Sequence, residues 1–107
     1  MTPEGVVVTI AGLPGHAGHT DGNPTDARFN DPEGLVVDAS GNLYIADAGN
    51  NLVRKITPSG GVTTLSLPTG DGARWHNPGG IAVDASGNVF VADTSHHCIR
   101  KLAPSLR

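Results

Sequence analysis

The sequence repeats itself with a period of 46 residues. Residues 32–58 align with residues 78–104, and 13 of the 27 aligned positions are identical. Both copies contain the stretch DASGN, then an apolar segment that ends in Ala-Asp, and then an Arg-Lys pair. A repeat of this length is typical of propeller blades and of other architectures in which each unit buries its apolar surface against the next. The duplication therefore predicts a repeat fold rather than one large core.

Each repeat has the pattern of short strands separated by turns. In the first copy the apolar segments are residues 34–38, 42–47, 52–56 and 62–65, and Gly, Asn and Ser separate them. These turn residues suit tight hairpins. No segment has a convincing helical periodicity of apolar residues. We therefore expect an all-β fold of four-stranded antiparallel meanders with almost no helix.

The DASGN stretch, at residues 38–42 and 84–88, has two interpretations. Its glycine suits a hairpin that needs a positive φ angle. Its Asp, Ser and Asn oxygens are also the ligands that calcium prefers. Five residues cannot encircle a calcium ion, and the glutamate of an EF-hand is missing, so we favour the turn.

The beginning of the chain resembles the end of a repeat, because VVTI at residues 7–10 aligns with VTTL at residues 62–65. A propeller needs about 4–8 blades to close. We therefore expect the N-terminal strand of one copy to complete the last blade of a neighbouring copy, in a contact that closes by rotation. The predicted organisation is an outer strand in residues 1–12, an entry loop in 13–31, a complete blade in 32–65, an inter-blade loop in 66–77 and a three-stranded partial blade in 78–107.

Nearly the whole chain resembles the NHL repeat family. The stretch DGNPTDARFNDPEGLVVDASGNLYIADAGNNLVRKITPSGGVTTL is similar to its pattern of an Ala-Arg-Phe-Asn-x-Pro entry, a Gly-Asn-Leu-Tyr-x-Ala-Asp centre and an Arg-Lys-Ile exit. Known NHL domains are commonly six-bladed propellers, so the resemblance implies a homotrimer of two-blade chains, with an eight-bladed tetramer as the next candidate. The family includes protein-interaction and RNA-binding modules, bacterial sensor domains and an amidating lyase, so the fold leaves the function open.

An acidic residue ends one strand of each copy and an arginine lies in the next strand. These residues are Asp47, Arg54, Asp93 and Arg100. A charge packed between blades needs a partner. We expect a structural Arg-Asp pair in each blade and no catalytic residue, because a catalytic group rarely needs repeating in every blade.

Antiparallel strands place the long entry loops and the loops after the Ala-Asp segments on one rim. Loops on a rigid scaffold usually carry recognition. The candidate ligand-binding residues are Arg28, Asn50, Asn51, Arg74, Trp75, His96 and His97. Three of them also have a structural interpretation. The aliphatic part of Arg28 or Arg74 can cover the aromatic ring of the next residue, and Trp75 can pack between blades as Phe29 does.

The five histidines suggest a metal hypothesis, because zinc accepts imidazole ligands and a ring would repeat each position by symmetry. Adjacent histidines in a strand or its turn tend to point in opposite directions, however. We expect neither a metal nor another cofactor. Cys98 occupies the position of Leu52 and is expected to be a small buried apolar residue rather than a nucleophile.

The formal net charge of −3, from 7 basic and 10 acidic residues, argues against a nucleic-acid partner. No apolar run approaches the ~18 residues of a membrane span, so no membrane partner is expected either. No signal-peptide pattern is present at the start, and the compartment is left unassigned.

We predict a non-catalytic scaffold or binding module that self-assembles into a ring, as a whole protein or as a natural or engineered piece of a longer propeller. Its partners are other copies of itself and a protein or small molecule on the loop rim. The alternatives are a metal-dependent lyase or hydrolase of the NHL type and an RNA-binding NHL module.

Overall fold

The computed structural model describes residues 7–65 and 75–103, and its strands form two antiparallel sheets. The first sheet has the order β1 (Pro32–Val37), β2 (Leu43–Asp47), β3 (Leu52–Ile56) and β4 (Val62–Leu65). The second sheet has the order β5 (Pro78–Val83), β6 (Val89–Asp93) and β7 (Cys98–Leu102). The predicted all-β fold, with one four-stranded and one three-stranded meander, is confirmed.

The DASGN stretch forms the hairpin turn between the first two strands of each sheet. In the first copy the Asp38 carboxylate accepts hydrogen bonds from the backbone N–H groups of Ser40, at 2.9 Å, and Asn42, at 3.0 Å. Gly41 supplies the positive φ angle of 90° that the turn requires. The Asp84 carboxylate makes the same two backbone contacts in the second copy. The stretch is therefore a turn, as predicted.

Two short 3-10 turns that the sequence pattern did not indicate connect the second and third strands of each sheet. They are η1 (Ala48–Asn50) and η2 (Thr94–His96). Each ends at a residue in the left-handed region, Asn51 with φ 56° and His97 with φ 57°. In the part of the chain that the structure describes, no helix has the length and apolar character needed to cross a membrane.

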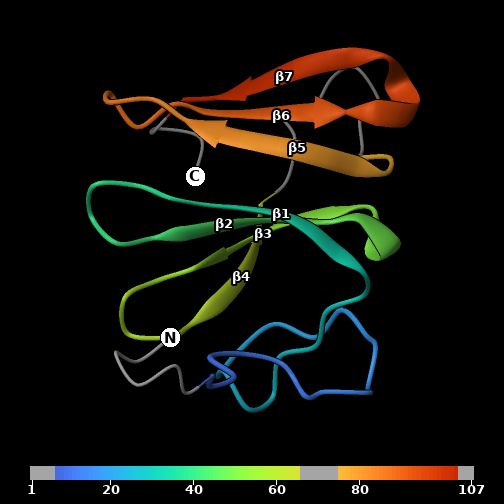
Figure 1. The fold of residues 1–107 in the computed structure, drawn as a ribbon, viewed down its shortest axis with the longest axis vertical. Coiled ribbons are helices and arrows are strands. Elements are labelled where there is room, and N and C mark those ends of the chain that lie inside the picture. The colour runs from blue at the N-terminus through green and yellow to red at the C-terminus, as the bar shows by residue number, and fades with distance from the viewer. Residues whose placement is uncertain (1–6, 66–74, 104–107) are drawn as a thin grey trace.

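The two sheets stack face to face, and residues 7–31 form a third layer on the opposite side of the first sheet (Figure 1). Apolar residues from both sheets fill the space between them: Tyr44, Val53, Leu65, Trp75, Val89, Val91 and Leu102. A second cluster lies under the third layer and contains Ala27, Ile45, Ile56 and Val62. Side chains alternate between the two faces of a strand, so the first sheet packs one set against the second sheet. On the other side, residues 7–31 cover Ile45, Ile56 and Val62 but leave Leu35 and Val37 exposed.

The expected N-terminal strand at residues 1–12 falls partly outside the described residues. Residues 7–12 belong to neither sheet. The physical reason is that a strand needs a neighbour to satisfy its backbone groups, and no strand of the described residues is paired beside them. Residues 66–74, most of the expected inter-blade loop, are also outside the described residues.

Candidate functional site

The arginine of the first repeat lies in a buried network of charged and polar groups. Arg54 is 0% exposed, and its Nη1 atom donates to Asp47 Oδ2 at 2.9 Å. Its Nη2 atom donates to Asp21 Oδ1 at 2.7 Å and to the Thr20 carbonyl at 2.8 Å. Its guanidinium carbon lies 4.8 Å from the centroid of the Phe29 ring, within the range of a cation–π interaction. The arginine therefore ties β3 to the segment that precedes the first sheet.

The second repeat contains the corresponding pair. Arg100 Nε donates to Asp93 Oδ2 at 2.8 Å, and the arginine side chain is 25% exposed. The other oxygen of the aspartate accepts the backbone N–H of His76, at 2.9 Å, as Asp47 accepts that of Asn30, at 2.8 Å. Each pair thus fastens a strand hairpin to the chain that enters its sheet, which is a structural arrangement.

Sequence reasoning missed the part that Asp21 and Thr20 play around Arg54. The Asp21 carboxylate also accepts a hydrogen bond from Thr64 Oγ1, at 2.9 Å, so it connects two strands of the first sheet. The internal repeat carries no signal for it, because the position 46 residues later is Leu67.

The two asparagines proposed for the rim, Asn50 and Asn51, make hydrogen bonds to distant segments of the chain. Asn50 Nδ2 donates to the Gly18 carbonyl and to Asp47 Oδ2. Asn51 Oδ1 accepts the backbone N–H of Asn77 at 2.7 Å, immediately before β5. Asn51 therefore links the first sheet to the start of the second.

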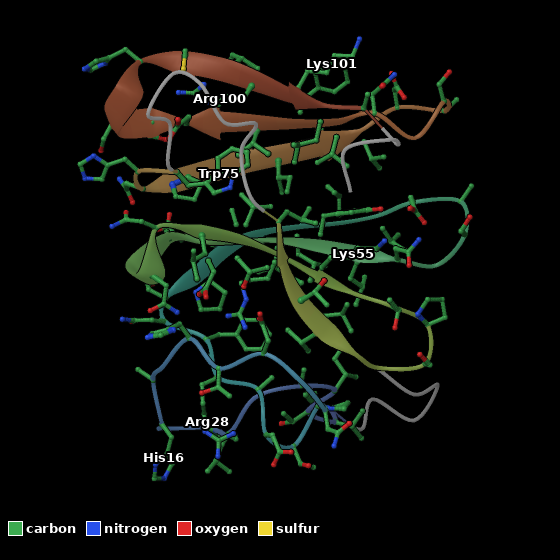
Figure 2. The ribbon with its side chains drawn as sticks, turned by 180° about the vertical axis from the view of Figure 1, so that it is seen from behind. His16, Arg28, Lys55, Trp75, Arg100 and Lys101 are labelled. Atoms are coloured by element: carbon green, nitrogen blue, oxygen red, sulfur yellow. The ribbon has the colours of Figure 1, made fainter. Side chains whose placement is uncertain are left out.

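Two of the remaining rim candidates, Arg28 and Trp75, make contacts within the described part of the chain. Trp75 lies buried between the two sheets, where its Nε1 donates to the Leu65 carbonyl at 2.9 Å, so a surface ligand cannot stack on it (Figure 2). Arg28 donates to the carbonyls of Thr25 and Ala27 in its own segment. His97 is exposed at the end of η2, His96 is the last residue of η2, and Arg74 lies outside the described residues.

The prediction that Cys98 is buried was wrong. It is exposed, although its counterpart Leu52 is half-buried. Cys98 begins β7, the last strand of the second sheet, and no further strand of the described residues covers it. Within residues 7–65 and 75–103, no three His, Cys, Asp or Glu side chains are grouped as metal ligands.

Asp38 has a strongly lowered pKa. Desolvation acts to raise it, but the hydrogen bonds from Asn42 and Tyr44 outweigh that effect and lower the pKa from 3.8 to about 2. The Tyr44 hydroxyl donates to Asp38 Oδ2 at 2.8 Å while its ring is fully buried between the sheets. The turn is thus tied to the core by a charged hydrogen bond.

On the outer side of the second sheet, here called the trailing face, each apolar residue is more exposed than its repeat counterpart in the first sheet. The trailing face consists of Gly80, Ala82, Phe90, Ala92 and Ile99. Ile99 is 70% exposed, whereas its counterpart Val53 is 0% exposed in the core between the sheets. Lys101, two residues further along β7, also projects away from the first sheet (Figure 2).

On the side of the first sheet that faces away from the second sheet, the third layer leaves part of β1 uncovered, and this exposed apolar surface is here called the leading face. It is the side of the first sheet that carries Leu35 and Val37, with residues 10–11 and 29 beside them. Leu35 is 59% exposed and Val37 is exposed too, whereas their counterparts Ile81 and Val83 pack against the core between the sheets. A mainly apolar hollow of about 270 Å³ lies here, with Ile10, Phe29 and Ile45 in its lining.

The NHL repeat model matches residues 29–56 and 76–102, just over half of the chain. A solved Bacteroides thetaiotaomicron protein of unknown function has a TM-score of 0.82 at 29% identity, over 96% of this chain and 28% of that one. A putative phosphatase from the same organism has a TM-score of 0.75 at 26% identity, over 89% of this chain and 26% of that one.

Among curated proteins, Protein SUPPRESSOR OF QUENCHING 1, chloroplastic, of Arabidopsis thaliana is 44% identical over 50 residues, which is 47% of this chain and 5% of that protein. The chain thus spans a small part of that protein and about a quarter of the solved structures it matches. The first matched segment contains β1 to β3, the second contains β5 to β7, and each contains one of the Arg-Asp pairs. The chain belongs to the NHL repeat family.

Proposed function

We propose that the chain is a non-catalytic NHL module that assembles head to tail with further copies of itself into a closed ring of blades. The trailing face and the leading face carry the same repeat positions as the two sides of the contact between the sheets inside the chain. Ile99 on the trailing face has the place of buried Val53, and Leu35 on the leading face has the place of packed Ile81.

Burial of these residues supplies a driving force for association. Full burial of one aliphatic side chain is worth about 1.5–3 kcal/mol. Contiguous exposed apolar surface commonly marks an interaction site. Because the leading and trailing faces differ from each other, the contact between copies is heterologous, and such a contact forms a ring when its rotation closes.

A propeller of about 4–8 blades is the ring that such blades form. Three copies of a two-blade chain supply six blades, which favours a homotrimer, and four copies supply eight. The match to only about a quarter of the solved chains supports the view that two blades are one portion of a larger ring. In a longer polypeptide, the same two faces would pack against its other blades.

The rim that carries η1 and η2 is the proposed place for a protein or small-molecule partner. Both 3-10 turns lie at the same end of the sheets (Figure 1). Asn50 and Asn51 are occupied with internal hydrogen bonds. The exposed side chain of His97 is therefore the rim candidate to substitute first in a binding assay.

Two charged substitutions test the assembly. Leu35→Asp places a carboxylate on the leading face and Ile99→Asp places one on the trailing face, each at a position already exposed in the single chain. Burial of an unpaired charge is strongly unfavourable. We expect each variant alone to remain at 10.9 kDa in light scattering behind size-exclusion chromatography.

An equimolar mixture of the two variants provides the matched control. The Leu35→Asp copy keeps an intact trailing face and the Ile99→Asp copy keeps an intact leading face. One joint can therefore form, and we expect a species of about 22 kDa, twice the chain mass of 10.9 kDa. Head-to-tail assembly through these faces is refuted if either variant alone forms a full ring. It is also refuted if the mixture stays monomeric while the unmodified chain assembles.

A further inference from the structure

We propose that β7 receives residues Val7–Ile10 of a second copy as its fourth antiparallel strand, with Ile10 opposite Ile99 and Val7 opposite Leu102. The inference rests on the ring assembly proposed above and specifies the register of its joint.

The second sheet has an open edge at β7. Its strand order ends there, whereas the first sheet continues from β3 to β4. No strand of the described residues pairs with the outer edge of β7. Such a row of backbone N–H and C=O groups is a template for pairing with another chain. Recognition of an extended segment by an open sheet edge gains its affinity from these main-chain hydrogen bonds.

The first sheet supplies the template for the register. There β4 pairs with β3 so that Leu65 lies opposite Val53 and Val62 lies opposite Ile56. Val62 and Leu65 are both buried in this arrangement. The two residues face opposite sides of the sheet, Val62 toward the third layer and Leu65 toward the second sheet.

Two sequence alignments give the same register for β7 and residues 7–10. The 46-residue period places Ile99 and Leu102 at the positions of Val53 and Ile56. The stretch VVTI at residues 7–10 has the pattern of VTTL in β4. Ile10 then lies beside Ile99, and residue 7 lies beside Leu102.

The segment that would pair is exposed in the single chain. Val7 is 82% exposed, and Val8 and Ile10 are exposed as well. Three exposed aliphatic residues within four positions are costly to leave in water, since each is worth about 1.5–3 kcal/mol when fully buried. Pairing with β7 places Val8 and Ile10 on one side of the sheet and Val7 and Thr9 on the other.

The position of Ile10 shows why the partner is a second copy. Ile10 lines the apolar hollow beside Phe29 and Ile45 on the leading face, as Leu65 packs beside Trp75 and Val91 in the core between the sheets. Residues 7–10 thus already lie where the fourth strand of a preceding blade would lie. The chain's own β7 is on the far side of the first sheet (Figure 1), so residues 7–10 cannot pair with the β7 edge of the same copy.

Cysteine cross-linking between copies tests the register. In a Cys98→Ser background, a chain with Ile10→Cys is mixed with a chain with Ile99→Cys and oxidised mildly. Directly opposite side chains have Cβ atoms within reach of a disulfide. We expect a covalent dimer on a non-reducing gel from the mixture and little from either chain alone. A second pair, Val8→Cys with Lys101→Cys, uses two exposed positions and is expected to cross-link as well.

Thr9→Cys mixed with Ile99→Cys is the register control, because residue 9 faces the other side of the strand. At least a tenfold lower yield of covalent dimer is expected from this pair. If the mixed chains assemble in light scattering but neither opposite pair cross-links above the control, the strand exchange is refuted and the ring assembly stands. If the unmodified chain is a folded monomer, both are refuted.

Discussion

Gly34 and Gly80 have equivalent positions in the repeat, but we expect alanine at Gly34 to lower the stability of the single chain and alanine at Gly80 to weaken assembly. A Cβ atom on Gly34 would lie 2.5 Å from the Gly79 carbonyl oxygen and 3.0 Å from a methyl group of Ile81. The oxygen belongs to the backbone of β5 and cannot rotate away. Overpacking of this kind costs about 1–3 kcal/mol. Gly34→Ala should therefore lower the free energy of unfolding by that amount, as measured by urea denaturation at a low chain concentration.

Gly80 has the same place on the trailing face, but a Cβ atom there would meet only the Ala92 methyl group, at 3.9 Å. This is an ordinary contact, and alanine in a strand is about 0.5–1 kcal/mol better than glycine in conformational entropy. Gly80→Ala should therefore leave the single chain at least as stable as before.

The effect of Gly80→Ala should appear in assembly instead. In the proposed joint, the 46-residue period brings Gly80 against the backbone of Glu33 and the side chain of Leu35 in the next copy. A cost of about 1–3 kcal/mol at each joint corresponds to an affinity reduced roughly 5- to 150-fold. Sedimentation velocity over a dilution series measures that affinity. Unchanged assembly of the Gly80→Ala chain, or full stability of the Gly34→Ala chain, would show that the close contact has been assigned incorrectly.

Three further substitutions test the internal contacts. Asp47→Ala leaves the fully buried Arg54 without its aspartate partner in β2, and we expect a loss of about 3–5 kcal/mol in unfolding free energy, measured in urea; a loss below 1 kcal/mol contradicts the network. Trp75→Ala empties a buried site between the sheets and should cost about 3–5 kcal/mol, whereas a chain that keeps its melting temperature would place the ring outside the core. Asp38 has a pKa lowered to about 2, so its contribution to stability is present above pH ~4 and is lost as the pH falls toward 2. The Asp38→Asn chain should lack that part of the acid-induced loss, and identical acid profiles of the two chains would refute the assignment.

The repeated elements could be predicted from the sequence because local chemistry determines them. Alternating apolar residues and the turn residues of DASGN specify hairpins without help from distant parts of the chain. The order of both sheets follows from those hairpins. The pairing of Arg54 with Asp47 was also accessible, since a charge in an apolar strand needs a nearby partner.

The unpredicted features depend on contacts that have no counterpart in the repeat. Asp21 reaches Arg54 from 33 residues away and occurs once, so neither periodicity nor duplication indicates it. Cys98 was expected to be buried by analogy with Leu52, but analogy assumes the same neighbours on both sides of the strand, and β7 is the last strand of its sheet. The rim residues Asn50 and Asn51 were grouped by their loop, whereas their partners lie in the segments that enter the two sheets.

Native mass spectrometry of the unmodified 107-residue chain measures directly whether copies of it associate into a ring. We expect a closed assembly with a main species of about 33 kDa, three times the chain mass of 10.9 kDa, or a species of about 44 kDa if the ring has eight blades. Light scattering on the same sample should give the same mass in solution. A well-folded species at 10.9 kDa, with no higher mass at increasing concentration, would contradict the assembly of this chain into a ring.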